Sequence, residues 1–540
     1  MMNKKNYTIL FLLISFSFFS CNTLKQSGID YSPLDYTSEN LEENEIKRIE
    51  QLLDNDCIKA LWRAKLLGNE KIFVKTKDTV VKKIQKNLEE KDYFTALKDF
   101  YSLKTVDASY VKNVGIPEKD LIALNNKDIP GLKVDNSLLP SNLNDCIDAT
   151  VTIWVDKGIS IKNGIGYADR VLGSGFFIDS RGYIVTNHHV ISDMVNPKYE
   201  GFSRLYIKIA KDNETRIPAK IIGYDAVLDL ALLKCEIDPP FILQLGSSSS
   251  LTVGDKVSTI GTPLGLHGTV TSGIVSSVSR KLFSMGDVFQ IDAAVNSGNS
   301  GGPLIDDNYR VQAIVFAGIM QYQGLNFAIP VEYLRQDLPF LYKGGKREHT
   351  WTGGYGHTKK DNYKEIGLDV QYVMPGSVLD RAGIRTGDLI TFVDDERVCS
   401  IEDFHSVLRN FSKDSILKLS YIRDGQTEHT FIYLEARPDN PGYSVYKQDL
   451  ISGAMVPLFG MELTPSSTLY SRKFTITRII NGSIADESGF SINDPVTILD
   501  VQFDEEKTVM GLQVSTKKRK KGYIDISIGM SSALDSAFYF

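Results

Sequence analysis

Residues 298–303 read Gly-Asn-Ser-Gly-Gly-Pro, and residues 292–296 before them read Asp-Ala-Ala-Val-Asn. Glycines on both sides of Ser300 let backbone amides turn inward toward one point. Amides aimed at the place where an oxyanion forms stabilise that charge and lower the reaction barrier by several kcal/mol. This stretch therefore predicts a nucleophile loop rather than a linker.

A pair of histidines ends a predicted hairpin upstream of this loop. A strand is expected over residues 173–178, the turn Asp-Ser-Arg-Gly follows at 179–182, and residues 183–186 form a β-rich return strand. The hairpin presents His188 and His189 at its end. Because successive side chains of a strand point to opposite faces, only one of the two histidines can face a cleft.

A carboxylate that could orient the histidine opens the next apolar strand. Asp229 directly precedes the run Leu-Ala-Leu-Leu at 230–233, where a buried acid is expected. Asp225 is the alternative acid, but it lies in a turn-like context after Gly223 and Tyr224.

These three residue types support acyl transfer to water. A serine hydroxyl needs a base to take its proton, a histidine titrates close to neutrality, and a buried carboxylate fixes the imidazole tautomer. The chain order His, Asp, Ser is that of chymotrypsin rather than of subtilisin or the α/β-hydrolases. The hydrolase elbow also needs a helix after its serine, whereas Pro303 and the polar residues 306–308 lead into another predicted strand at 311–316.

Seven stretches occur in the order seen in HtrA/Deg serine proteases, and this resemblance covers residues 145–345 and, more weakly, the rest of the chain toward residue 540. The resemblance implies a multidomain, mainly β chain with a chymotrypsin-like double β-barrel protease domain at 145–342. The stretches are Gly-Ser-Gly-Phe at 173–176, Thr-Asn-His-His-Val at 186–190, Asp-Leu-Ala at 229–231, Ile-Gly-Thr-Pro-Leu-Gly at 260–265, Thr-Ser-Gly-Ile-Val-Ser at 271–276, residues 298–303, and Asn-Phe-Ala-Ile-Pro at 326–330.

The resemblance also implies the roles of individual residues. The family places its histidine directly before a valine or cysteine position, so His189, Asp229 and Ser300 are implied to be the catalytic triad. The backbone amides of Gly298, Asn299 and Ser300 are implied to form the oxyanion hole.

Two expectations concern control and specificity. Chymotrypsin-type zymogens carry an acid immediately before the serine, but this chain has Asn299 there, so we expect control by loop ordering rather than by cleavage. Trypsin-like enzymes keep a specificity acid six positions before the serine, where this chain has Ala294. With Leu325, Asn326 and Phe327 as the wall, a shallow apolar pocket is predicted, which favours cleavage after small or medium apolar residues.

The first residues of the chain predict where in the cell the protein is located. A basic start and an apolar run over residues 9–19, too short to span a bilayer, predict a signal peptide at 1–20. The run ends in a sequence that resembles a bacterial lipobox, so lipidation of Cys21 is expected; ordinary signal cleavage beside a chance cysteine is the alternative. Residues 21–40 are a polar tether. We therefore expect a membrane-anchored lipoprotein of the bacterial envelope, facing the periplasm or the cell surface, with the choice of membrane open.

Composition excludes several kinds of site. The chain has 540 residues and a net charge of −6, so nucleic acid is not an expected partner. The histidines and cysteines show no metal-ligand or redox spacing, so no metal and no cofactor are expected. A disulfide stays open among Cys57, Cys146, Cys235 and Cys399, as in other proteins outside the cytoplasm.

Residues 41–112 are helical by pattern, because apolar residues recur at helical spacing. A cap or spacer is expected here, with a partner-binding region as the alternative. Residues 113–144 contain three prolines and are predicted to be a linker. HtrA proteins often form trimers, so a homo-oligomer stays open, although the usual trimer-forming segment is not recognisable.

A PDZ domain is expected at 350–437, since residues 370–390 closely resemble the centre of a PDZ domain in HtrA proteins. Its predicted carboxylate loop contains Gly354, Tyr355 and Gly356, and the alternative is the run Ile-Gly-Leu at 366–368. Such a loop offers amides to a peptide end while the peptide adds as a strand. The helix that faces this groove would start near Ile401 and include Phe404 and Leu408.

A degenerate PDZ-like domain is expected at 453–540. Residues 458–461 are its candidate carboxylate loop, and Asn-Asp-Pro at 493–495 replaces the usual Gly-Asp turn, which puts ligand binding by this copy in doubt. Residues 537–540 are predicted to form the last strand or, alternatively, a C-terminal ligand that the chain presents to a PDZ groove.

Together these features predict a lipid-anchored, HtrA-like serine endopeptidase. Its expected substrates are misfolded or specific envelope proteins, bound as unfolded chains or through C-terminal peptides. One alternative is a non-catalytic PDZ chaperone or scaffold of the envelope. Another is a sensor that cuts one partner only after a PDZ ligand binds.

Overall fold

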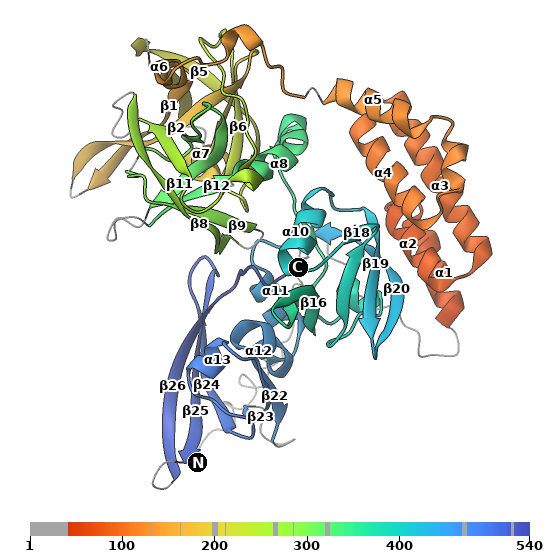
Figure 1. The fold of residues 1–540 in the computed structure, drawn as a ribbon. Helices are drawn as coiled ribbons and strands as arrows, with labels where there is room; N and C mark the ends of the chain where they lie inside the picture. Colours follow the sequence, from red (N-terminus) through yellow and green to blue (C-terminus); the bar gives the residue numbers. More distant parts are fainter. Residues whose placement is uncertain are drawn as a thin grey trace, which may run out of the picture.

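A computed structural model gives the fold of the chain (Figure 1). It describes residues 41–129, 131–162, 164–196, 203–210, 212–262, 268–283, 286–296, 298–318, 325–466, 472–519 and 523–540. The predicted signal peptide, the tether and Cys21 lie outside the described residues.

Two closed β-barrels form the predicted protease region, as the fold prediction required. The first barrel closes because β5 pairs with both β4 and β6. Its strands are β1 (Thr150–Lys162), β2 (Ile165–Asp179), β3 (Tyr183–Thr186), β4 (Arg204–Ile209), β5 (Asp212–Asp225) and β6 (Leu230–Cys235). The second runs in the order β10-β11-β12-β9-β8-β7. Its strands are β7 (Lys256–Gly261), β8 (Thr269–Phe283), β9 (Gly286–Ile291), β10 (Pro303–Ile305), β11 (Val311–Gly318) and β12 (Asn326–Pro330).

Alternation along the strands fills these barrels. Val151, Ile153 and Val155 on β1 are fully buried in one core, as a period of two requires. Short helices join or flank the strands, and α7 lies between the two barrels in Figure 1. The helices are α6 (Leu143–Asp148), α7 (His188–Val195), η3 (Ser248–Ser250) and α8 (Val331–Lys343).

A PDZ sheet follows the protease region. Its strands run in the order β15-β16-β17-β19-β20, and α10 begins with a capping box formed by Ser400 and Asp403. Two small pairings join it to its surroundings, β13 with β5 and β14 with β21. The elements are β13 (Gly345–Lys346), β14 (Thr350–Trp351), β15 (Gly354–Asp361), β16 (Lys364–Val373), α9 (Val378–Arg381), β17 (Leu389–Val393), β18 (Glu396–Arg397), α10 (Ile401–Arg409), β19 (Ile416–Arg423), β20 (Gln426–Tyr433) and β21 (Glu435–Ala436).

The second PDZ-like region is a meander in the order β22-β23-β24-β25-β26. Residues 504–508 form a turn between β24 and β25, where the first PDZ domain carries α10 in the corresponding connection. The last strand ends at Ala533, so residues 537–540 are not part of this sheet. The elements are α11 (Pro441–Gln448), α12 (Ile451–Phe459), β22 (Met461–Pro465), β23 (Lys473–Ile479), α13 (Ile484–Glu487), β24 (Pro495–Phe503), β25 (Val509–Arg519) and β26 (Tyr523–Ala533).

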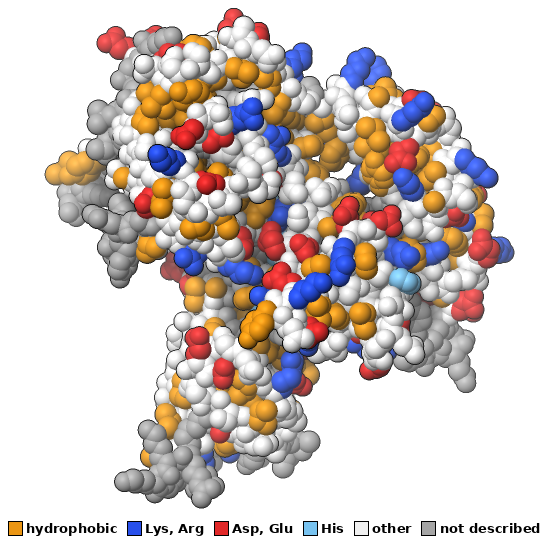
Figure 2. Space-filling view, in the orientation of Figure 1, with side chains coloured by type: hydrophobic (Ala, Val, Ile, Leu, Met, Phe, Trp, Pro, Cys, Tyr) orange, Lys and Arg blue, Asp and Glu red, His pale blue; other side chains and the backbone are white. Residues whose placement is uncertain are grey.

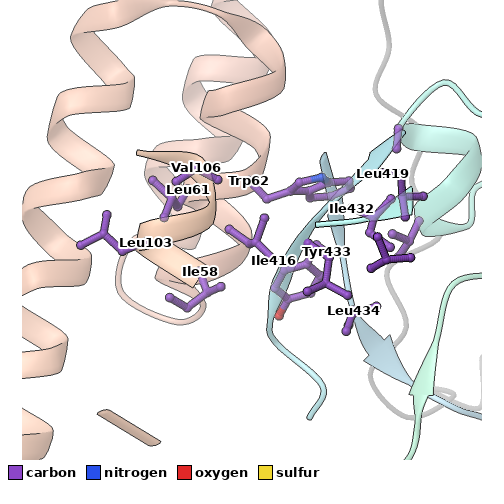
Figure 3. Packing of buried hydrophobic residues seen from close by; sticks show 14 of the residues in the cluster. Ile58, Leu61, Trp62, Leu103, Val106, Ile416, Leu419, Ile432, Tyr433 and Leu434 are labelled. Atoms are coloured by element: carbon purple, nitrogen blue, oxygen red, sulfur yellow. The ribbon is translucent and has the colours of Figure 1, made fainter. Parts of the chain in front are cut away.

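The N-terminal helices cover one side of the first PDZ sheet (Figure 3). Trp62 is buried against Tyr433 of β20, and its Nε1 donates to the Phe431 carbonyl at 2.5 Å. A buried carboxylate, Glu435, accepts from Lys59 of α2 at 3.0 Å and from Arg381 of α9 at 2.8 Å. The helices are α1 (Leu41–Leu52), α2 (Cys57–Leu67), α3 (Glu70–Glu89), α4 (Tyr93–Val106), η1 (Tyr110–Val114), α5 (Glu118–Asp128) and η2 (Asn136–Leu138).

This packing supports the cap reading of the helical region. The helices and the PDZ sheet share one hydrophobic core. Residues 113–144, predicted to be a linker, contain α5, whose Leu121 is buried in that core. Pro117 precedes α5 and Pro140 lies between η2 and α6, so the described part of this segment contains short helices instead of an extended linker.

Three general features complete the fold. The thiols of Cys57, Cys146, Cys235 and Cys399 are free, so the open disulfide alternative is not formed. Among the described helices, none combines the length and apolar character needed to cross a bilayer. Charges of both signs are interspersed over the face shown in Figure 2.

Candidate active site

The histidine and the aspartate predicted for catalysis form a hydrogen-bonded pair. His189 Nδ1 lies 2.7 Å from Asp229 Oδ2, and the His189 backbone N–H donates to Asp229 Oδ1 at 2.8 Å. This N–H lies in the first turn of α7, where backbone donors lack helical acceptors. The carboxylate therefore fixes both the ring and the helix end, while 45% of the His189 side chain stays exposed.

His188 lies outside this pair. Its ring stacks on Tyr224 at a centroid distance of 5.1 Å, and burial lowers its pKa. The two histidines point apart because they lie in the first turn of a helix, not because they alternate along a strand as predicted.

Ser300 lies in the loop between β9 and β10 of the second barrel, three residues before β10. Its hydroxyl donates to the Phe316 carbonyl at 3.2 Å. Across the described residues, no hydrogen bond joins Ser300 Oγ to His189. The His189–Asp229 pair is thus assembled, whereas the Ser300 hydroxyl has a different partner.

Ser174 of β2 anchors the nucleophile loop to the first barrel. Its backbone N–H donates to the Ser300 carbonyl at 2.8 Å, and its hydroxyl donates to the Gly298 carbonyl at 2.6 Å. Gly301 follows with φ at +84°, and a Cβ there would lie 2.2 Å from the Ser174 carbonyl oxygen. Glycine is needed at this position because both the backbone conformation and the contact exclude a side chain.

The three amides predicted for the oxyanion hole differ in their partners. The Asn299 N–H donates to the Asn296 carbonyl at 3.0 Å, so it is already engaged. The N–H groups of Gly298 and Ser300 have no acceptor among the described residues. Gly298 has φ at +102°, which glycine adopts without strain.

Asp225, the alternative acid, serves a different site. It is fully buried, and its Oδ2 lies 2.6 Å from His349 Nε2 in the segment before the PDZ domain. Its Oδ1 accepts the N–H groups of Val227 and Leu228 at 2.8 and 3.0 Å. These bonds shape the turn that ends at Asp229.

Burial sets the charges of this network. Burial lowers the pKa of His349 more than Asp225 raises it, and His349 Nδ1 has no partner among the described residues. Burial also raises the pKa of Asp337 well above its usual value, and the neighbouring Asp225 adds to this. Burial alone would raise the pKa of Asp225 too, but the bonds from His349 and the backbone lower it overall. His349 and the backbone donors therefore favour the ionised form of Asp225, whereas burial favours the uncharged forms of His349 and Asp337.

The four residues predicted to line the specificity pocket differ in exposure. Ala294 is exposed and Leu325 is half-buried, whereas Asn326 and Phe327 are buried. Asn326 Nδ2 donates to the Ala293 carbonyl at 2.8 Å, so the side-chain amide links the start of β12 to the segment after β9.

The predicted PDZ carboxylate loop carries an occupant from the same chain. The N–H groups of Gly353 and Gly354 both donate to the Phe540 backbone oxygen at 3.0 Å, and the Gly356 N–H donates to the Phe538 carbonyl at 3.0 Å. The alternative loop at 366–368 instead lies inside β16, between β15 and β17.

His405 of α10 completes this groove. Its Nε2 lies 2.9 Å from the Tyr539 carbonyl oxygen, so it must carry a proton and donate. Burial lowers the pKa of His405 to about 3, with a smaller contribution from Arg409, which keeps the ring neutral near pH 7. No sequence signal indicates this contact, although His405 follows Phe404 in the predicted groove helix.

The equivalent loop of the second PDZ-like region is occupied by its own helix. Gly460 corresponds to Gly353, because both have positive φ and both lie against a serine, Ser483 and Ser377 respectively. The Gly460 N–H donates to the Val456 carbonyl at 2.9 Å and caps α12. This amide is not free for a peptide, and the described residues of this region include no helix like α10.

Four protein families match parts of the chain. They are a trypsin-like peptidase domain at 173–314, a PDZ domain at 353–434, the TP0546 family PDZ domain at 442–534, and a domain of unknown function (DUF8517) at 41–121.

Curated relatives share this organisation in part. A Bartonella henselae protein is 36% identical over 281 residues, which are 50% of this chain and 54% of the relative. A Brucella suis protein is 33% identical over 349 residues, which are 61% of this chain and 65% of the relative. Both are named "Probable periplasmic serine endoprotease DegP-like". The chain thus spans between about half and two thirds of the length of these relatives.

Solved structures that match include the HtrA-type protease AlgW with a decapeptide, at 22% identity and a TM-score of 0.45 over 55% of this chain and 99% of that one. A serine endoprotease from Yersinia pestis matches at 25% identity and a TM-score of 0.41, over 56% of this chain and 100% of that one. The chain therefore combines a trypsin-like peptidase domain with PDZ domains, and its curated relatives are named DegP-like serine endoproteases.

Proposed function

We propose that this chain is a serine endopeptidase in which Ser300, His189 and Asp229 form the catalytic triad. The observation that carries the proposal is the His189–Asp229 pair, closed by two hydrogen bonds beside the nucleophile loop. A carboxylate on Nδ1 leaves Nε2 unprotonated in the neutral ring, as a general base requires.

In the proposed reaction the Ser300 hydroxyl leaves the Phe316 carbonyl and turns to His189 Nε2. The imidazole takes the hydroxyl proton while Oγ attacks the peptide carbonyl carbon. The protonated ring then gives that proton to the leaving amine, and the peptide C–N bond breaks. Water next attacks the acyl-enzyme, and His189 again takes and returns a proton, which releases the acid and restores Ser300.

The proposed oxyanion hole has two backbone donors instead of the three that were predicted from the sequence. Gly298 and Ser300 would donate, because the Asn299 N–H is bound to Asn296. Two fixed donors are the usual arrangement for the tetrahedral oxyanion of acyl transfer. The Ser300–Phe316 bond supports control by a small rearrangement of this loop.

A fluorophosphonate probe tests the proposal directly. We expect it to label the protein covalently and the Ser300→Ala variant not at all, since the probe reacts only with an activated serine. Casein cleavage should be lost in the same variant, and mass spectrometry of the products would locate the cuts. Equal labelling of both proteins would refute the assignment of Ser300.

The Ser300–Phe316 bond also supports a second function, a PDZ chaperone or scaffold without catalysis. A serine held away from its base does not react. This reading requires that the wild-type protein neither cleaves casein nor reacts with the probe, yet suppresses aggregation of an unfolded protein.

For specificity, we propose cleavage after small or medium apolar residues. The exposed Ala294 and the half-buried Leu325 remain as the surface that a substrate side chain would meet. Unfolded or misfolded envelope proteins are the proposed substrates, because they expose apolar segments in extended form. A homo-oligomer such as a trimer is part of the same proposal, and a mass measurement in solution would detect it.

We also propose that the protein is an envelope lipoprotein anchored through Cys21. The support is the signal-like sequence before Cys21 and the word "periplasmic" in the names of the curated relatives. Cells fed a labelled fatty acid should incorporate the label into the wild-type protein and not into Cys21→Ser. Label that persists in the variant would place the acyl chain elsewhere.

A further inference from the structure

The last three residues of the sequence lie in the groove of the first PDZ domain. Tyr539 pairs antiparallel with Tyr355, and the Phe540 N–H donates to the Gly354 carbonyl at 3.0 Å. Together with the Gly353, Gly354 and Gly356 amides described above, this forms a short added strand. Figure 1 places this end of the traced chain beside α10. Strand addition to a sheet edge beside a helix is one of the general modes of peptide recognition.

Phe540 fills an apolar pocket of the first PDZ domain. Only 2% of its surface is exposed, and its ring lies 5.2 Å from the Phe404 ring of α10. A Cβ at Gly354 would lie 2.3 Å from Phe540 Cε2. The absence of a side chain at Gly354 therefore makes room for an aromatic residue.

Tyr539 points to the opposite face, as successive residues in an extended segment do. It is 1% exposed and packs against Trp351 and Tyr355 in the core of the second PDZ-like region. Adjacent residues thus enter two different cores. The segment fastens the second PDZ-like region to the first.

Phe538 extends the contact toward the protease region. Its ring lies 4.2 Å from the His357 ring, and Lys281 Nζ of β8 lies 5.5 Å from its centroid. The groove thus accommodates one aromatic residue at the last position, Phe540, and a second one at Phe538, two positions before it.

We propose that residues 538–540 are the resident ligand of the first PDZ groove. A peptide segment from another protein must displace residues 538–540 before it binds. The inference rests on the proposed function only in that the PDZ domain binds peptides, and it requires no catalysis.

The expected cost of displacement follows from the tether. A segment held within its own protein competes at an effective concentration in the millimolar range. A peptide that binds the open groove at about 10 µM would then bind the occupied groove on the order of 10²-fold more weakly.

The test uses the full chain with Ser300→Ala, so that no cleavage occurs, and a fluorescein-labelled peptide of residues 531–540. Fluorescence anisotropy should show weak binding to this parent protein. With Phe540→Asp added, binding should tighten on the order of 10²-fold, because a buried charge expels the tail. Tyr363→Asp places the same charge on a 99% exposed aromatic and should leave binding unchanged.

Two further measurements locate the peptide. Gly354→Ala added to Phe540→Asp should abolish binding, because the new methyl group would occupy the aromatic pocket. Hydrogen exchange in the parent should show the Phe540 amide deprotected by excess peptide while the Gly356 amide stays protected. This second measurement needs no change in the tail, so it holds even if Phe540→Asp impairs folding.

Two outcomes would overturn the inference. One is a Phe540→Asp protein that is folded yet binds the peptide no better than its parent. The other is bound peptide with undiminished protection of the Phe540 amide. Neither outcome touches the catalytic proposal, because every protein in the series lacks the Ser300 hydroxyl.

Discussion

We expect His189→Ala to lower kcat about 10⁶-fold and Asp229→Asn about 10⁴-fold. Without the imidazole, nothing takes the Ser300 proton. Asparagine keeps the shape of Asp229 but carries no charge, so it cannot stabilise the protonated ring. Its amide also favours the tautomer with the proton on Nε2, which leaves no base facing the serine. Steady-state cleavage of a fluorogenic peptide with valine before the cut would measure both losses.

His188→Ala is the matched control, since His188 is the neighbouring residue of the same helix. Its ring stacks on Tyr224 instead of bonding to Asp229, so we expect kcat to stay within about threefold of wild type. If His188→Ala and His189→Ala lost activity equally, the two histidines would be wrongly assigned. If Asp229→Asn kept most of the activity, the orienting role of the carboxylate would fail.

Local signals explain what the sequence could predict. The nucleophile loop has its glycines and its serine within six residues, so the residues themselves indicate its chemistry. The double barrel and the first PDZ sheet were predicted from the resemblance to HtrA/Deg proteases, whose sequence motifs occur here in the same order. The groove helix was predictable from Ile401, Phe404 and Leu408, which are buried on one face of α10.

Contacts between distant residues were not predictable in the same way. Asp225 and His349 are 124 positions apart, and His405 and Tyr539 are 134 apart. Nothing near Asp225 indicates a buried histidine, so its turn-like context was the only signal. Likewise, the apolar faces of α2 and α4 predict burial, but they do not indicate that the PDZ sheet covers them.

We expect His349→Ala to lower the free energy of unfolding by about 3–5 kcal/mol, because it leaves the buried Asp225 carboxylate without its partner. Activity should fall as well, since Asp225 holds the amides of Val227 and Leu228 just before Asp229. Asp337→Asn is the matched control in the same cluster. Burial raises the pKa of Asp337 well above its usual value and so favours the protonated form, which is why a neutral amide of the same shape should cost no more than about 1 kcal/mol. Urea unfolding and peptide cleavage would be measured on each variant.

Because of His349, we expect the stability of the folded protein to fall as the pH falls. The pKa of His349 is lower in the folded protein than its usual value near 6.5. Below about pH 6.5 the unfolded chain therefore binds a proton that the folded chain excludes, and stability falls as the pH falls. His349→Gln keeps a donor for Asp225 without titrating, so its melting temperature should drop less than that of wild type between pH 7.5 and pH 5.5. The low pKa of His405 gives both proteins the same background slope and cancels in the comparison. An identical drop in both proteins would mean that His349 is charged in the fold, and the buried site would then be an ion pair rather than a neutral donor on a carboxylate.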